Sequence, residues 1–159
     1  MRITTRFLIL LIIFVSITIW EKIQATDIAV TGSWVLSIGA TDLVAGAGSD
    51  LEPNYTSASD AVQIDISNTA GNWQVDVRRT DSNWHSNFIL KVKRTSDGTG
   101  SGTISGGTTE VTVTQTDQEF FTGSSDRGDV HVELTLENVS VQIPPDSYMT
   151  TVYYTVVDI

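Results

Sequence analysis

The sequence contains no cysteine, and this absence excludes a disulfide framework, a thiolate metal site and lipid attachment at a leader cysteine. Histidine is nearly as rare, with 2 residues, and nucleophilic hydrolysis needs a base beside its nucleophile. Basic residues are also few, because 9 Lys and Arg stand against 19 Asp and Glu. Since phosphate binding depends on clustered cations, this acidity argues against a nucleic-acid partner.

Two short basic clusters remain, namely Arg78 with Arg79, and Lys91 with Lys93 and Arg94. Both alternate with apolar residues, and we interpret them as the exposed faces of strands rather than as a binding patch. Thr, Ser, Val and Gly are frequent in residues 26–159, while Lys and Leu are few there. That composition favours sheets and turns over helices.

Residues 1–25 have the composition of a secretory signal. A positive start is followed by an apolar run of 14 residues at positions 7–20, and cleavage is expected after Ala25. A membrane span takes about 20 residues, so a permanent anchor is the alternative, kept open by the bulky Ile23 near the cleavage site. The predicted product is a secreted chain, residues 26–159, with 6 basic and 18 acidic residues and no membrane span.

Apolar residues recur at every second position in segment after segment, which is the pattern of strands with one buried face. The alternating sets are Val62, Ile64 and Ile66; Trp73, Val75 and Val77; Leu90 and Val92; Val111 and Val113; Val130, Val132, Leu134 and Leu136; and Val139, Val141 and Ile143. Turn formers separate them at residues 68–72, 81–83, 96–107 and 122–128. With the two end strands, the sequence predicts one domain, an immunoglobulin-like or pilin-like antiparallel β-sandwich of about eight strands.

The first and last strands differ from the others. Within residues 28–38 the apolar side chains on the even positions are Ile28, Val30, Trp34, Leu36 and Ile38. At the other end, one face carries Tyr148, Val152, Tyr154 and Val156, and the opposite face carries Met149, Tyr153 and Val157. A strand with apolar side chains on both faces needs cover on two sides.

Two interpretations of these end strands stay open. They are ordinary members of the domain's own sandwich, or the first strand leaves its domain and completes the sheet of a neighbour through main-chain hydrogen bonds. In the second case residues 28–38 are the donor, and the last strand flanks the acceptor groove. Such a head-to-tail contact does not close, so it would build a fibre.

The C-terminal residues 143–156 contain a Pro-Pro turn, then Tyr148, Val152, Tyr154 and Val156. This stretch resembles the last strand of spore coat protein U and chaperone-usher pilin domains, where a proline- or glycine-containing turn precedes a Tyr-x-x-Thr-Val pattern. The resemblance implies a secreted sandwich subunit of an appendage or coat, polymerised by donor strands. The cysteine pair that is frequent in those families is missing here, and residues 39–142 carry no motif of theirs.

No motif in the chain predicts a catalytic residue, a cofactor or a metal site. His131 is expected on the outer face of its strand and His85 in a polar loop, so neither is placed in a triad. Residues 98–107 are rich in glycine but lack the Gly-Lys-Ser/Thr ending of a phosphate-binding loop, and they predict a flexible hairpin loop. The turn residues that could offer oxygens to calcium, without EF-hand spacing, are Asp81, Asn83, Asp97, Asp126 and Asp129.

Aromatic residues supply the main competing function. Trp84 and His85 fall in a predicted loop, where an exposed ring could stack on the apolar face of a sugar. Trp73, Phe120 and Phe121 are expected to pack in the core or at its rim. The expected function is a non-enzymatic structural subunit at the cell surface, whose partners are copies of itself or related subunits. The alternative is a monomeric carbohydrate-binding or adhesin module that contacts glycans through Trp84 and His85.

Overall fold

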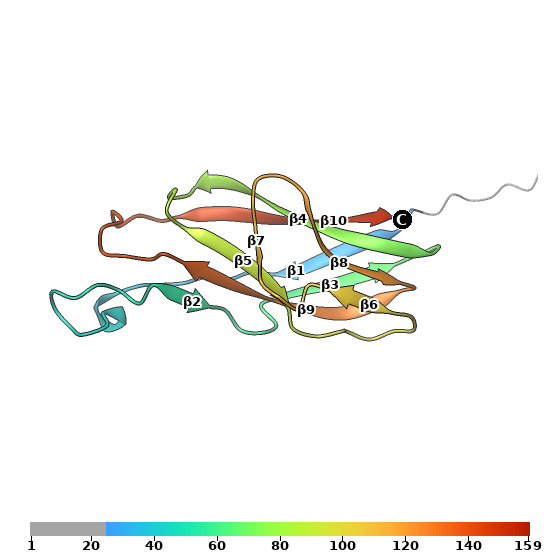
Figure 1. Ribbon diagram of the computed structural model, residues 1–159, viewed down its shortest axis with the longest axis horizontal. Helices are drawn as coiled ribbons and strands as arrows, with labels where there is room; N and C mark the ends of the chain where they lie inside the picture. Colours follow the sequence, from blue (N-terminus) through green and yellow to red (C-terminus); the bar gives the residue numbers. More distant parts are fainter. Residues whose placement is uncertain (1–24) are drawn as a thin grey trace, which may run out of the picture.

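The computed structural model describes residues 25–159, so the expected leader up to residue 24 lies outside the described residues. The described chain forms two antiparallel sheets packed face to face (Figure 1). Its elements are β1 (Asp27–Gly32), the short 3-10 turn η1 (Ala40–Asp42), β2 (Asn54–Thr56), β3 (Val62–Ser67), β4 (Asn72–Asn83), β5 (Ile89–Arg94), β6 (Ile104–Gly106), β7 (Val111–Thr112), β8 (Gln118–Ser124), β9 (Arg127–Glu137) and β10 (Met149–Asp158). The predicted antiparallel β-sandwich is confirmed, with ten strands in the described residues.

The order of the strands separates segments that are neighbours in the sequence. The first sheet has the order β1-β3-β9-β5-β7, and β2 also pairs with β9. The second sheet has the order β10-β4-β8-β6. Within the described residues, no two consecutive strands of the chain are hydrogen-bonded neighbours. Both sheets are therefore built from segments that lie far apart in the sequence.

The alternating apolar residues fill the space between the two sheets. Trp73 and Phe121 are completely buried, and their rings meet edge to face with centroids 6.0 Å apart. The indole Nε1 of Trp73 donates a hydrogen bond to the carbonyl oxygen of Ser125 at 3.0 Å. Phe120 is buried beside Phe121. The predicted core packing of these three aromatic residues is confirmed.

The predicted strand through Val139, Val141 and Ile143 is wrong. Asn138 has a φ of 66°, which ends β9, and the main-chain N–H of Ile143 donates to the carbonyl oxygen of Ser140 at 3.0 Å. The segment is a turn, and it brings Val139 and Ile143 together in a smaller hydrophobic cluster at one end of the molecule. A turn can bury residues four positions apart, so alternation alone did not distinguish it from a strand.

The predicted turn at residues 81–83 is also wrong, because β4 continues through it and pairs with β10 there. Asp81 is accommodated by hydrogen bonds from Arg79, from the Thr150 hydroxyl at 2.8 Å and from the Gln115 amide at 2.9 Å. Burial raises the pKa of Asp81, but these hydrogen bonds outweigh it and hold the pKa below its usual value. A charged residue is thus tolerated within a strand where turn chemistry was expected.

Arg94 corrects the prediction that both basic clusters lie on the surface. It is 5% exposed, because it follows Leu90 and Val92 on the inward-facing positions of β5. Its guanidinium donates to the carbonyl oxygens of Gly106 at 3.0 Å and Ser96 at 2.9 Å, and it forms an ion pair with Asp97. Burial of this cation is therefore matched by acceptors from the segment that follows β5.

The glycine-rich residues 98–107 are held against the sandwich, which corrects the prediction of a flexible hairpin loop. They include β6, and the buried Arg127 donates to the carbonyl oxygen of Gly102 at 2.6 Å. Gly102 has a φ of 100°, and a Cβ atom there would stand 2.3 Å from the carbonyl oxygen of Ser124. Glycine is required because two stretches of main chain approach this closely.

Tyr154 of β10 carries a hydroxyl group that is buried without a hydrogen-bond partner among the described residues. Burial raises the pKa of this phenol. Because an unsatisfied buried polar group costs about 1–3 kcal/mol, we expect Tyr154→Phe to increase the free energy of unfolding by about 1 kcal/mol. Urea denaturation measures this change. The exposed neighbour offers a control, since Tyr153→Phe should stay within about 0.5 kcal/mol of wild type; a destabilised Tyr154→Phe variant would contradict the assignment.

Candidate functional site

The first strand lies in its own sheet. β1 pairs with β3 in an antiparallel register that places Ile28 opposite Ile66 and Val30 opposite Ile64. Ile28 packs against the main core, whereas Val30 is 42% exposed. For residues 27–32 the structure therefore agrees with the first interpretation, an end strand of the domain's own sandwich.

Residues 33–38, the second half of the predicted donor, leave the sheet. Trp34 packs against the main core, Ile38 packs against the smaller cluster, and Leu36 is half-buried. Val35 points away and is 89% exposed. Within the described residues, the main chain of this segment makes no hydrogen bond to the rest of the protein. It is held in place by its side chains alone.

The last strand, β10, forms the border of the second sheet and pairs only with β4. Tyr154 is buried in the core, and Val152 and Val156 are half-buried against it. The outward positions Met149, Tyr153 and Val157 are 60%, 44% and 43% exposed. The predicted two-faced character of this strand is thus present, with one face toward the core and the other uncovered.

The other sheet borders are shorter than β10. β6 has 3 residues, β7 has 2, and β1 has 6 and begins with Asp27. β10 has 10 residues, and residues 149–157 carry no charged side chain. In Figure 1 the end of β10 lies beside the start of β1, where the Thr26 hydroxyl bonds to the Asp158 carboxylate. The β10 edge, residues 149–157, is the longest unpaired border that the structure describes.

Tyr153 is the one aromatic side chain on the outward face of the β10 edge. The guanidinium of Arg78, its cross-strand neighbour, lies 4.5 Å from the ring centroid. Arg78 also forms an ion pair with Asp117 at 3.4 Å. A cation above the ring favours this orientation of Tyr153, which stays 44% exposed.

The two predicted ligand-contact residues lie at the end of the molecule that contains the smaller cluster. Trp84 is half-buried, meets Phe88 edge to face with centroids 5.4 Å apart, and has the guanidinium of Arg79 5.1 Å from its ring. His85 packs against Phe88 and Tyr148, with centroids 5.7 Å and 6.0 Å away. The structure brings Trp84 and His85 together with Tyr148, and this arrangement favours a packing role for both.

The acidic turn residues have protein partners of their own. Asp97 pairs with Arg94, and Asp126 accepts hydrogen bonds from the main chain and hydroxyl of Thr69 at 3.0 Å and 2.9 Å. These contacts lower the pKa of both carboxyl groups. Among residues 25–159, no group of three or more His, Asp and Glu side chains is arranged to hold a metal ion.

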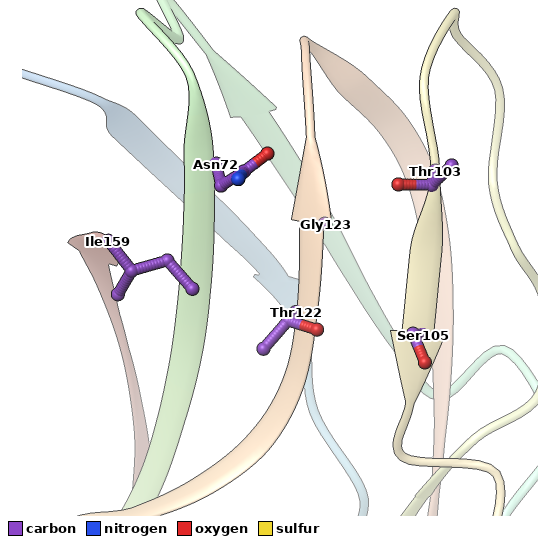
Figure 2. A pocket seen from close by; sticks show the side chains of 6 residues that line it. All are labelled: Asn72, Thr103, Ser105, Thr122, Gly123 and Ile159. Atoms are coloured by element: carbon purple, nitrogen blue, oxygen red, sulfur yellow. The ribbon is translucent and has the colours of Figure 1, made fainter.

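A shallow hollow of about 220 Å³ lies over the second sheet (Figure 2). Its lining residues are Asn72, Thr103, Ser105, Thr122, Gly123 and Ile159. The polar groups are hydroxyls and one amide, and no titratable side chain is among them. The side chains that line this hollow therefore supply neither a general acid nor a general base.

The protein therefore belongs to the structural class of antiparallel β-sandwiches, and its edge strand β10 carries no charge over residues 149–157. Comparison with protein-family models, with curated proteins and with solved structures finds no match to this chain. No helix in the described part of the chain is long and apolar enough to cross a membrane. The resemblance of the last strand to coat-protein and pilin domains therefore stays a prediction.

The amino-acid sequence marks the residues of β10 by their apolar and aromatic side chains, but it does not indicate on which side the strand stays unpaired. The available signal was the absence of charge across residues 149–157. For the first strand the signal was Gly32, whose φ is 123° and where a Cβ atom would lie 2.2 Å from the carbonyl oxygen of Ala61. Pairing with β3 ends at this glycine, so the prediction of a continuous strand over residues 28–38 is wrong for residues 33–38, which are not part of a strand.

Proposed function

We propose that this protein is a non-enzymatic, extracellular structural subunit of a cell-surface appendage or coat, which assembles with other copies by β-strand complementation. The observation that carries the proposal is the unpaired β10 edge. A border strand presents a row of free N–H and C=O groups that another strand can complete. Complementation at β10 would extend the second sheet without disturbing the core.

The sequence of the β10 edge also favours pairing. Natural sandwiches usually protect a long border with lysine, proline or inward-pointing charge, and residues 149–157 contain none of these. They are mostly β-branched or aromatic, which suits a strand that is covered on both sides. An unprotected border of this length is consistent with a surface that is covered in the working protein.

The net charge of the chain also favours the β10 edge as the site of assembly. The formal net charge is −10 at pH 7, so two copies repel each other over most of their surfaces. The uncharged β10 edge is a surface on which the approach of a second copy meets less repulsion. If the predicted secretory leader is used, such assembly would take place outside the cell, as a role in an appendage or coat requires.

Two lysines on the β10 edge are expected to prevent assembly while leaving the fold intact. Thr151 and Thr155 are both exposed, and Thr155 lies opposite Asp76 of β4, so Thr151→Lys/Thr155→Lys should change the stability by no more than about 0.5 kcal/mol. Lysine protects sheet borders against pairing. We expect self-association of the mature chain to weaken at least about tenfold, a change of about 1.4 kcal/mol, measured by sedimentation velocity and negative-stain microscopy.

A matched control places the same two charges away from the border. Ser101 and Thr109 are exposed residues outside every strand, and Ser101→Lys/Thr109→Lys should assemble like wild type. If both double variants assemble equally well, the joint does not involve β10. A wild-type chain that stays monomeric over the whole concentration range would end the proposal.

A further inference from the structure

We propose that the strand which completes the β10 edge is β10 of a second copy, running antiparallel about a two-fold axis beside Tyr153. This inference rests on the proposed function and names the partner strand. It would join two second sheets into one continuous sheet. Because the same surface is used by both copies, the contact is isologous and closes as a dimer, which then becomes the building unit of any larger assembly.

The alternation of side chains restricts where the axis can lie. In β10 the even-numbered residues face the core and the odd-numbered residues face outward. Residues directly opposite each other in an antiparallel pair share a face, so an even residue must meet an even residue. The two-fold axis therefore passes beside a residue and never between two residues. Tyr153 is the central residue of the uncharged run 149–157.

Features at the two ends of the β10 edge limit the part of the strand that can pair, and Tyr153 lies near the middle of that part. At one end Thr26 bonds to Asp158 of its own chain. A partner strand that extended beyond Val157 would therefore meet the segment at Thr26. At the other end the pairing of β10 with β4 has a register shift between Met149 and Thr150. The straight part of the border thus lies between these limits, on both sides of Tyr153.

Antiparallel self-pairing about Tyr153 places aromatic and β-branched side chains opposite one another. On the outward face Tyr153 meets its own symmetry mate, and Thr151 meets Thr155. On the inward face Val152 meets Tyr154, which covers the half-buried Val152. Aromatic pairs and pairs of β-branched residues are the combinations that stabilise neighbouring strands. No charged residue of β10 faces another one in this register, because Asp158 lies beyond it.

Residues 33–38 are the competing partner, since their main chain is also unpaired. As a donor, this segment would have to withdraw Trp34 from the main core and Ile38 from the smaller cluster. Pairing of β10 with β10 needs no such rearrangement, because both borders are already extended and uncovered. The folded protein can therefore form the symmetric β10–β10 contact without a conformational change.

Single cysteines test the axis directly, because the chain has no cysteine of its own. Opposite Cα atoms in an antiparallel pair are about 4.5–5.5 Å apart, within the range of about 4.4–6.8 Å that a disulfide accepts. Only a residue on the axis meets its own copy, so Tyr153→Cys should form disulfide dimers at least about tenfold faster than the surface control Thr109→Cys. Thr151→Cys mixed with Thr155→Cys should cross-link, whereas each alone should not.

Each outcome separates this inference from the proposed function. Rapid dimerisation of Tyr153→Cys, in a variant that melts like wild type, supports the axis. If wild type associates but Tyr153→Cys reacts no faster than Thr109→Cys, the axis is wrong while assembly stands. If Val35→Cys cross-links to Tyr153→Cys instead, residues 33–38 are the partner and the inference is overturned. A wild-type chain that never associates contradicts the proposed function itself.

Discussion

Replacing Gly123 with alanine is expected to destabilise the sandwich by about 2–3 kcal/mol, the cost of overfilling a packed core. Gly123 lies in β8, directly against the indole of Trp73. A Cβ atom there would stand 2.4 Å from two carbon atoms of the indole ring and 2.8 Å from the carbonyl oxygen of Thr103. Trp73 cannot move away, because its side chain is fully buried and its Nε1 is bonded to Ser125. Urea denaturation followed by tryptophan fluorescence measures the loss.

Two further variants separate this clash from a general effect of removing glycine. Gly71→Ala places a methyl group where no atom lies within 4 Å, so its stability should stay within about 0.5 kcal/mol of wild type. In a Trp73→Phe background the two clashing carbon atoms are absent, and Gly123→Ala should cost less than it does in wild type. Equal costs in both backgrounds would show that the indole is not what excludes the methyl group.

Arg94→Ala is expected to cost about 3 kcal/mol, because it leaves the carbonyl oxygens of Gly106 and Ser96 without their donor and opens space in the core. The adjacent Lys93 is the matched control. It points outward and pairs with Glu133 at 2.7 Å on the surface, so Lys93→Ala should cost no more than about 1 kcal/mol. Thermal or urea denaturation compares the two variants, and similar losses would contradict the buried role of Arg94.

The class of fold could be predicted because burial of one face imposes a period of two on nearly every strand. Val62, Ile64 and Ile66 of β3 show this rule, and they are buried as the alternation requires. The same rule would have placed Arg94 inside, since it shares its position in the alternation with Leu90 and Val92. Its charge favoured the surface, and the compensating carbonyl groups come from a glycine-rich segment whose path is set by tertiary contacts.

The candidate site was predictable only in part. Alternating apolar residues identified β10, because both of its faces are marked in the sequence. Which border of a strand stays unpaired depends on the order of strands in the sheet, and that order is fixed by contacts between distant segments. Trp84 shows the same limit. It follows the last residue of β4, and its packing against Phe88 and Arg79 depends on how the strand ends meet.

Among residues 25–159 no strand pairs with the next strand along the chain, so each strand pair joins segments that are separated by at least one other strand. A hairpin of two consecutive strands could form locally, but β2, β3 and β5 all pair with β9, which comes late in the chain. The edge strand beside β4 is β10, the last strand. During synthesis from the N-terminus, neither sheet can be completed before residues 127–158 have emerged. Folding through such non-local pairing is slow, on the order of milliseconds to seconds. The chain therefore acquires its order late, and loss of these final strands would remove the centre of one sheet and the margin of the other.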